Sequence, residues 1–115
     1  MRDQTVEVFF DPNAYPQFTF LPATVTMKAK GKIILFRRPQ DAPWDFVGGT
    51  VKNDNSKQFS FSVQGNGSKL HIDDEFKDLV KTPYDYAVTV KFDGKDYPSP
   101  DPVIVNEPGG GGTAP

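Results

Sequence analysis

The feature that most constrains the fold of this chain is a series of short segments in which apolar and polar residues alternate. The longest is Tyr84 to Phe92, where every second residue is aromatic or aliphatic, and a second runs from Phe59 to Gln64. Because side chains of a strand point alternately to two faces, this pattern indicates strands with one buried and one solvated face. Turn residues separate such segments about every 8 to 12 positions, which is typical of a two-sheet β-sandwich.

Further segments extend this pattern toward both ends of the chain. Thr5 to Phe10 alternates, and Ile33 to Phe36 is a continuous apolar run of the kind found in central strands. Pro22 interrupts an alternation and predicts a sheet edge there. Asn66-Gly67 and Asp93-Gly94 predict tight hairpin turns, each returning the chain antiparallel to the strand before it.

Together these segments predict an all-β fold, namely an immunoglobulin-like antiparallel two-sheet β-sandwich with one short helical turn. Residues 1–108 would form this single domain, since 115 residues suffice for one core. Four glycines follow Pro108, so we expect residues 109–115 to be a flexible tail that buries too little surface to offset its conformational entropy. The residues expected in the core include Phe59, Phe61, Tyr86, Val88, Val90 and Ile34.

Composition excludes several classes of function. With 13 basic and 15 acidic residues the net charge is −2, which repels a phosphate backbone, so nucleic acid is not an expected partner. There is no cysteine, which excludes disulfides and thiolate metal sites. No apolar run approaches the roughly 20 residues that cross a bilayer, and the first residues lead into a strand rather than a signal peptide, so we expect a cytoplasmic protein without membrane contact.

Residues suited to catalysis or metal binding are sparse. His71 is the only histidine and lies between Leu70 and Ile72, so its ring is expected to point away from their core face. A metal site or a catalytic triad needs further ligands or partners that the chain lacks. No phosphate-binding loop or nucleophile elbow is present. We therefore expect no enzyme activity, no cofactor and no metal.

An acidic cluster precedes the longest strand. Phe76, Leu79 and Val80 recur at spacings of three and four, which predicts one or two helical turns between residues 73 and 81. The acids would then complement the positive N-terminal end of that helix. A hard cation is the alternative, but the alternating ligands and central glycine of a calcium loop are missing. The acids concerned are Asp73, Asp74, Glu75 and Asp78.

Two resemblances to known families bear on the fold. Pro22 to Thr26, followed by Gly31 and the run Ile33 to Phe36, resembles the opening of a cupredoxin, and Tyr84 to Tyr86 resembles the strand entering the ligand loop of that family. A blue-copper centre needs two histidines and a cysteine, and this chain has one histidine and no cysteine. The resemblance therefore implies a sandwich scaffold without its metal.

The end of the chain carries the closer resemblance. Asp101-Pro102 and Glu107-Pro108 bracket the strand Val103 to Val105, a pattern similar to the DP-EP family of small bacterial proteins, named for these two dipeptides. The similarity extends from Phe18 through Pro108. It implies a sandwich fold and a bacterial source, and it carries over no activity and no catalytic residue.

The same segment gives the leading functional hypothesis. Alternating prolines remove ladder donors, so Val103 to Val105 is expected at a sheet edge. A rigid edge can dock a protein partner or a second copy of the chain, although prolines and charges also serve to block aggregation of edges, and both interpretations stay open. The residues displayed there would be Tyr97, Asp101, Asn106 and Glu107.

A different class of function would use exposed aromatic side chains. Trp44, Tyr15 and Tyr97 are the candidates for stacking on a carbohydrate or another small ligand. Most aromatic residues of a sandwich belong to its core, so we favour a non-enzymatic protein-interaction or structural module.

Overall fold

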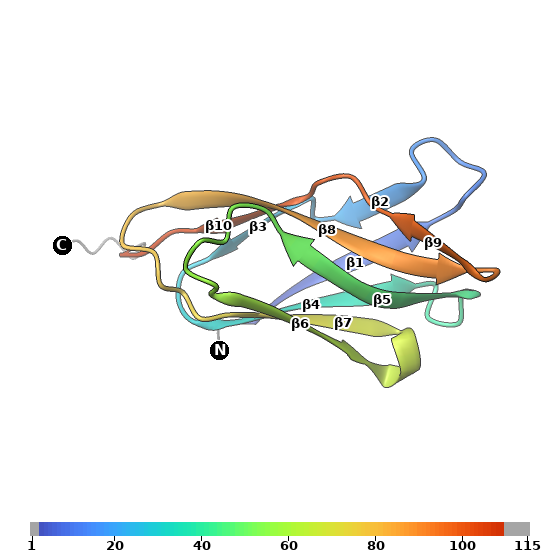
Figure 1. Cartoon of the computed structure of the whole chain (residues 1–115), viewed down its shortest axis with the longest axis horizontal. Helices are drawn as coiled ribbons and strands as arrows, with labels where there is room; N and C mark the ends of the chain where they lie inside the picture. The colour runs from blue at the N-terminus through green and yellow to red at the C-terminus, as the bar shows by residue number, and fades with distance from the viewer. Residues whose placement is uncertain (1–2, 110–115) are drawn as a thin grey trace.

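Ten strands form two sheets that pack face to face in the computed structural model of the chain, which describes residues 3–109 (Figure 1). The first sheet has the order β2 (Phe18–Leu21), β1 (Gln4–Phe10), β4 (Gly31–Arg38), β7 (Lys69–Asp74) and β6 (Phe59–Gln64). The second has the order β3 (Thr24–Met27), β10 (Val103–Asn106), β8 (Thr82–Phe92) and β5 (Trp44–Val51), and β9 (Lys95–Pro98) also pairs with β8.

The all-β sandwich expected from the alternation is confirmed. In β8 the residues Tyr84, Tyr86, Val88 and Val90 are buried and their neighbours in sequence are more exposed. The same period of two buries Val6 and Val8 of β1 and Ile33 and Leu35 of β4 on the facing sheet. One continuous apolar core therefore lies between the two sheets.

The strands are not all antiparallel, which corrects part of the expected fold. β1 pairs in parallel with β4, and β3 pairs in parallel with β10. Parallel neighbours need a crossover connection, and the chain supplies one because it leaves the first sheet after β2, runs through β3 in the second sheet and returns as β4. Both sheets are therefore mixed.

The prediction that the last strand lies at a sheet edge is wrong. β10 lies between β3 and β8, and its four residues pair with both neighbours. The prolines that suggested an edge lie outside the strand: Pro98 ends β9, and Pro100 and Pro102 lie in the loop that leads to β10. The predicted edge around Pro22 is confirmed, because β2 and β3 are edge strands of the two sheets.

The predicted helical turns between residues 73 and 81 are also absent. β7 continues to Asp74, the following segment is irregular, and Phe76 has a φ of 59°, which an α-helix does not allow. A single short helical turn among residues 3–109, a 3₁₀ turn, lies at Gly65–Gly67 instead. It replaces the expected tight turn but still connects β6 and β7 as an antiparallel hairpin.

The core prediction needs one correction and one refinement. Ile34 is half-buried on the outer face of β4, because Ile33 and Leu35 occupy the inner face. Phe59 and Phe61 are partly buried and pack against the core. The other three predicted core residues, Tyr86, Val88 and Val90, are fully buried.

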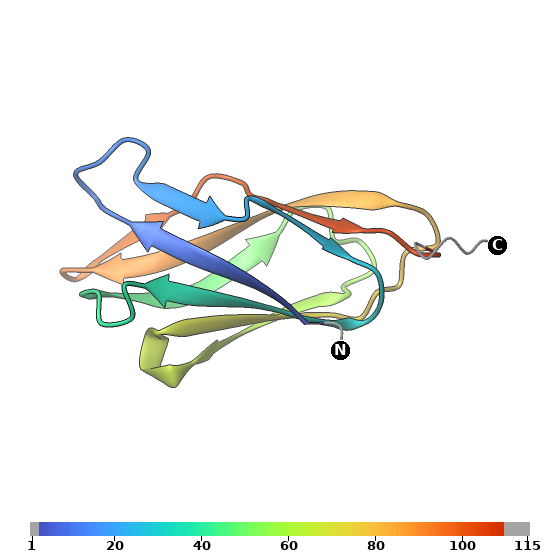
Figure 2. The same cartoon turned by 180° about the vertical axis from the view of Figure 1, so that it is seen from behind.

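The described part of the chain is elongated, with extents of 50 × 25 × 22 Å. The loop between β7 and β8 lies at the same end as the C-terminal end of β10, whereas the β1–β2 loop and the β8–β9 turn lie at the other end (Figures 1 and 2). Most of the expected tail, residues 110–115, lies outside the described residues.

Candidate functional site

Asp101 and Glu107, two of the predicted site residues, flank β10 and take part in ion pairs. Asp101 Oδ2 accepts a hydrogen bond from Lys52 Nζ at 2.6 Å, and Glu107 Oε1 accepts one from Lys28 Nζ at 3.0 Å. The bond to Asp101 raises the pKa of Lys52, and the bond from Lys28 lowers the pKa of Glu107. The two acids therefore tie the ends of the β10 segment to residues that follow β5 and β3.

The other predicted site residues do not join a common surface with them. Asn106 and Trp44 are 0% and 2% exposed, so neither is displayed as predicted. Tyr97 is half-buried, and its ring packs 5.1 Å from that of Phe10. It also pairs with Val90 near one end of β8, whereas Asn106 pairs with the other end.

Asn106 instead belongs to a buried polar cluster with Gln58, Asp74, Asp78 and Tyr84. Its Nδ2 lies 3.2 Å from both Gln58 Oε1 and Asp74 Oδ1, and 3.0 Å from Asp78 Oδ2. Gln58 Nε2 donates to Asp78 Oδ2 at 3.1 Å and to the Tyr84 hydroxyl at 2.9 Å. That hydroxyl donates to Asp78 Oδ1 at 2.7 Å. The cluster connects the two sheets, because Asp74 ends β7 while Tyr84 and Asn106 belong to β8 and β10.

Burial gives this cluster unusual electrostatics. Asp74 is 1% exposed, and loss of hydration raises the pKa of its carboxyl to about 6, helped by the negative charges of Asp78 and Asp54. Hydrogen bonds from the Phe76 amide and from Asn106 oppose this shift. Burial and the Asp78 carboxylate likewise raise the pKa of Tyr84. Asp74 is therefore a carboxyl group whose charge changes in weakly acidic solution.

The cluster fixes the base of the segment 75–81, which we call the apolar loop. The amide of Lys77 donates to Gln58 Oε1 at 2.7 Å, and the amide of Phe76 donates to Asp74 Oδ1 at 2.8 Å. At its tip Leu79 is 92% exposed and Val80 is 70% exposed. A loop with an ordered base thus presents two branched aliphatic side chains to solvent.

A cation does not fit the centre of the buried polar cluster. The amide nitrogen of Asn106 already occupies the point that lies close to Gln58 Oε1, Asp74 Oδ1 and Asp78 Oδ2. Nowhere in residues 3–109 do three or more histidine, cysteine or acidic side chains form a group that could hold a metal ion. The acids here accept hydrogen bonds instead.

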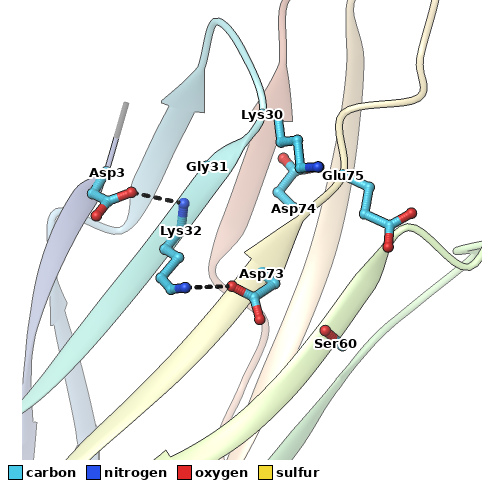
Figure 3. A pocket seen from close by; sticks show the side chains of 8 residues that line it. All are labelled: Asp3, Lys30, Gly31, Lys32, Ser60, Asp73, Asp74 and Glu75. Carbon is cyan, nitrogen blue, oxygen red and sulfur yellow. Dashed lines mark hydrogen bonds and ion pairs between the residues drawn. The ribbon is translucent and has the colours of Figure 1, made fainter. Parts of the chain in front are cut away.

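A hollow of about 540 Å³ opens beside Asp74. It lies next to the first residues of β1 and β4 and the last residues of β7 (Figure 3). Across it Lys32 Nζ lies 3.2 Å from Asp73 Oδ1, and the Lys32 amide donates to Asp3 Oδ1 at 3.1 Å. Ser60 is the one hydroxyl in the lining. The lining of the hollow is therefore mostly charged and is crossed by one salt bridge.

A second, apolar hollow of about 500 Å³ lies at the opposite end of the molecule, by the β1–β2 loop. It is lined by Tyr15, which is fully exposed, and by Pro16, Pro98 and Pro100. Tyr15 is thus the predicted stacking residue that the structure leaves open to solvent. Trp44 lies in the core, packed 5.1 Å from the Phe46 ring.

A family model described as the DP-EP family matches residues 3–108, which include both the Asp101-Pro102 and the Glu107-Pro108 dipeptides. The chain belongs to the DP-EP family. A comparison of this DP-EP protein with curated proteins finds no match. Within residues 3–109, none of the helical structure is long and apolar enough to span a membrane.

The DP-EP dipeptides thus frame the strand that delivers Asn106 to the buried polar cluster. Pro102 is buried, and its carbonyl accepts a hydrogen bond from the Tyr86 amide at 2.9 Å. On the other side of the strand the Glu107 amide donates to the Met27 carbonyl at 2.9 Å. In this DP-EP protein the backbone bonds of Pro102 and Glu107 position β10. β10 in turn positions Asn106, which belongs to the cluster that fixes the base of the apolar loop.

Proposed function

We propose that this DP-EP protein is a non-enzymatic interaction module that docks a protein partner through its apolar loop. The observation that carries the proposal is the exposure of Leu79 and Val80, 92% and 70%, at the tip of a loop whose base is hydrogen-bonded to buried side chains. Functional residues often lie on loops that a rigid scaffold positions. Burying such a side chain at an interface contributes about 1.5 to 3 kcal/mol.

The fixed base of the loop favours docking, because an ordered loop loses little conformational entropy when a partner binds. Glu107, one of the residues predicted for docking, is close enough to Lys81 for that charge to contribute to its lowered pKa. Charged side chains therefore lie beside the apolar tip, and polar residues are typical of the rims of protein interfaces. A partner with an apolar pocket and a charged rim fits this surface, and a second copy of the chain is one such candidate.

Cross-linking in cells that contain the native protein tests this proposal. We expect the double substitution Leu79→Ser with Val80→Ser to remove a cross-linked species that the unchanged protein forms. The matched control is Leu21→Ser with Val63→Ser, which removes two apolar side chains that are 52% and 41% exposed on other elements. Loss of the species in both variants, or in neither, would show that the apolar loop is not the docking surface.

The apolar hollow beside Tyr15 supports the alternative proposal, a carbohydrate or small-ligand module. An exposed ring next to three prolines offers a surface on which a sugar ring can stack. The alternative would be favoured if the protein binds a glycan, if Tyr15→Ala abolishes that binding, and if the variant with Leu79→Ser and Val80→Ser retains it. A cytoplasmic location and a bacterial source stay predictions from the sequence.

A further inference from the structure

Asp74 and Asn106 each keep one side-chain oxygen without a hydrogen-bond partner within residues 3–109, Oδ2 of the acid and Oδ1 of the amide. The two side chains already meet, because Asn106 Nδ2 lies 3.2 Å from Asp74 Oδ1. An amide and a neutral carboxylic acid can form two hydrogen bonds side by side, N–H to oxygen and O–H to oxygen. A carboxylate has no hydrogen to donate, so the second bond needs a protonated Asp74.

Neighbouring acidic side chains oppose the negative charge of Asp74. Asp54 and Asp78 are both negative and both contribute to the shifted titration of Asp74, whereas Lys30 lines the hollow on its outer side. Lys32, also in that lining, is paired with Asp73. The titratable groups around Asp74 are Asp54, Asp78 and Tyr84 in or beside the buried polar cluster and Asp3, Lys30, Lys32, Asp73 and Glu75 around the hollow.

We propose that a proton taken up from water by Asp74 Oδ2 is donated to Asn106 Oδ1 and locks the base of the apolar loop, so that the loop is held more firmly in weakly acidic than in neutral solution. The proton satisfies both unpartnered oxygens at once and removes one of three neighbouring negative charges. Its effect reaches the loop through Asn106, because Asn106 Nδ2 also contacts Gln58 Oε1, which accepts the hydrogen bond from the Lys77 amide at the base of the loop. The regulatory meaning rests on the proposed docking function, whereas the lock itself does not.

The sign of the effect follows from the raised pKa. Asp74 titrates at about 6 in the folded protein and at its ordinary value of 3.8 once the loop opens and water reaches it. Asp74 therefore binds a proton more tightly when the loop is closed than when it is open. Protonation stabilises the closed loop at pH values below 6, and this stabilisation is lost as the pH rises through 6. Between pH 7 and pH 5 we expect about a tenfold increase in the equilibrium constant for loop closure.

Amide hydrogen exchange of residues 75–81 in the full chain, corrected for intrinsic exchange rates, measures this constant. We expect about tenfold greater protection at pH 5 than at pH 7. In Asp74→Asn an amide N–H takes the place of the acid O–H, so protection should be the same at both pH values. Equal protection of the unchanged protein at pH 5 and pH 7 overturns the proposal, as does a pH dependence that survives in Asp74→Asn.

Two further measurements keep the test decisive. If Asp74→Asn does not fold, the carboxyl carbon of Asp74 in the unchanged protein is titrated by NMR: a midpoint near 6 supports the lock, and one near 4 overturns it. His71→Gln is the control for the only histidine, and it should retain the tenfold effect. The variant with Leu79→Ser and Val80→Ser should retain it too, so failure of docking and failure of the lock are distinguishable.

Discussion

Gln58 makes side-chain hydrogen bonds to four other residues although it carries a single amide. Its Nε2 donates to Asp78 and Tyr84, and its Oε1 accepts from the Lys77 amide and from Asn106. With an exposed fraction of 1%, it makes these bonds away from water. A buried amide with all its polar atoms paired stabilises one arrangement of its neighbours, because every other arrangement leaves some of them unpaired.

Replacing Gln58 by alanine should therefore destabilise the fold strongly. We expect Gln58→Ala to lower the free energy of unfolding by about 2 to 4 kcal/mol, since the Lys77 amide and Asn106 lose an acceptor that water does not easily replace. Urea denaturation measures the loss. Gln64→Ala is the matched control, because Gln64 is exposed and its side chain hydrogen-bonds only to Ser62 within the described chain. A similar small change in both variants would show that the cluster contributes little to stability.

The apolar loop shows why part of the site could not be predicted from the sequence. Phe76, Leu79 and Val80 have the spacing of a helix face, but the φ of 59° at Phe76 excludes a helix through this residue. Here the amides of Phe76 and Lys77 are bound by side chains of Asp74 and Gln58, and Gln58 is far away in the sequence. The strands, in contrast, were predictable, because alternation is a local property that each segment carries by itself.

The pairing of β10 is a second feature that could not be predicted from the sequence. The prolines beside it correctly indicate interrupted backbone pairing, yet the strand itself pairs on both sides. Its neighbour β3 lies about 80 residues earlier in the chain, as the register of Ile104 with Val25 shows, and no local pattern reveals such a pair. The DP-EP resemblance was predictable because it depends only on which residues stand in sequence.

The segment around β10 gives a prediction that separates its surface residues from its buried one. The double substitution Asp101→Ala with Glu107→Ala should change the Tm by no more than about 3 °C, because both ion pairs are exposed to solvent. Asn106→Ala should lower the Tm by more than about 8 °C, since two buried acceptors, on Gln58 and Asp74, and one half-buried acceptor, on Asp78, lose their shared donor. Thermal unfolding followed by circular dichroism measures both. The reverse order would show that the acids, and not the buried amide, hold β10.

At the scale of the whole molecule, the two sheets share one core, and side chains of both meet across it. Phe10 of β1 lies 6.0 Å from Trp44 of β5, and Phe20 of β2 lies 6.1 Å from Tyr86 of β8. The buried polar cluster joins the same two sheets nearer the other end. Neither sheet can bury its apolar face without the other, which favours all-or-none unfolding.

Trp44 allows this cooperativity to be measured. It is the one tryptophan in the chain, it is 2% exposed, and its ring contacts aromatic rings of both sheets. Its fluorescence therefore reports on the packing between the sheets, whereas far-ultraviolet circular dichroism reports on the strands themselves. We expect the two signals to give the same midpoint and the same slope in urea, because loss of contact between the sheets exposes the core on which the strands depend. If the fluorescence changes at a lower urea concentration than the circular dichroism signal of the strands, the sheets separate before they unfold. Each sheet would then be stable without the shared core.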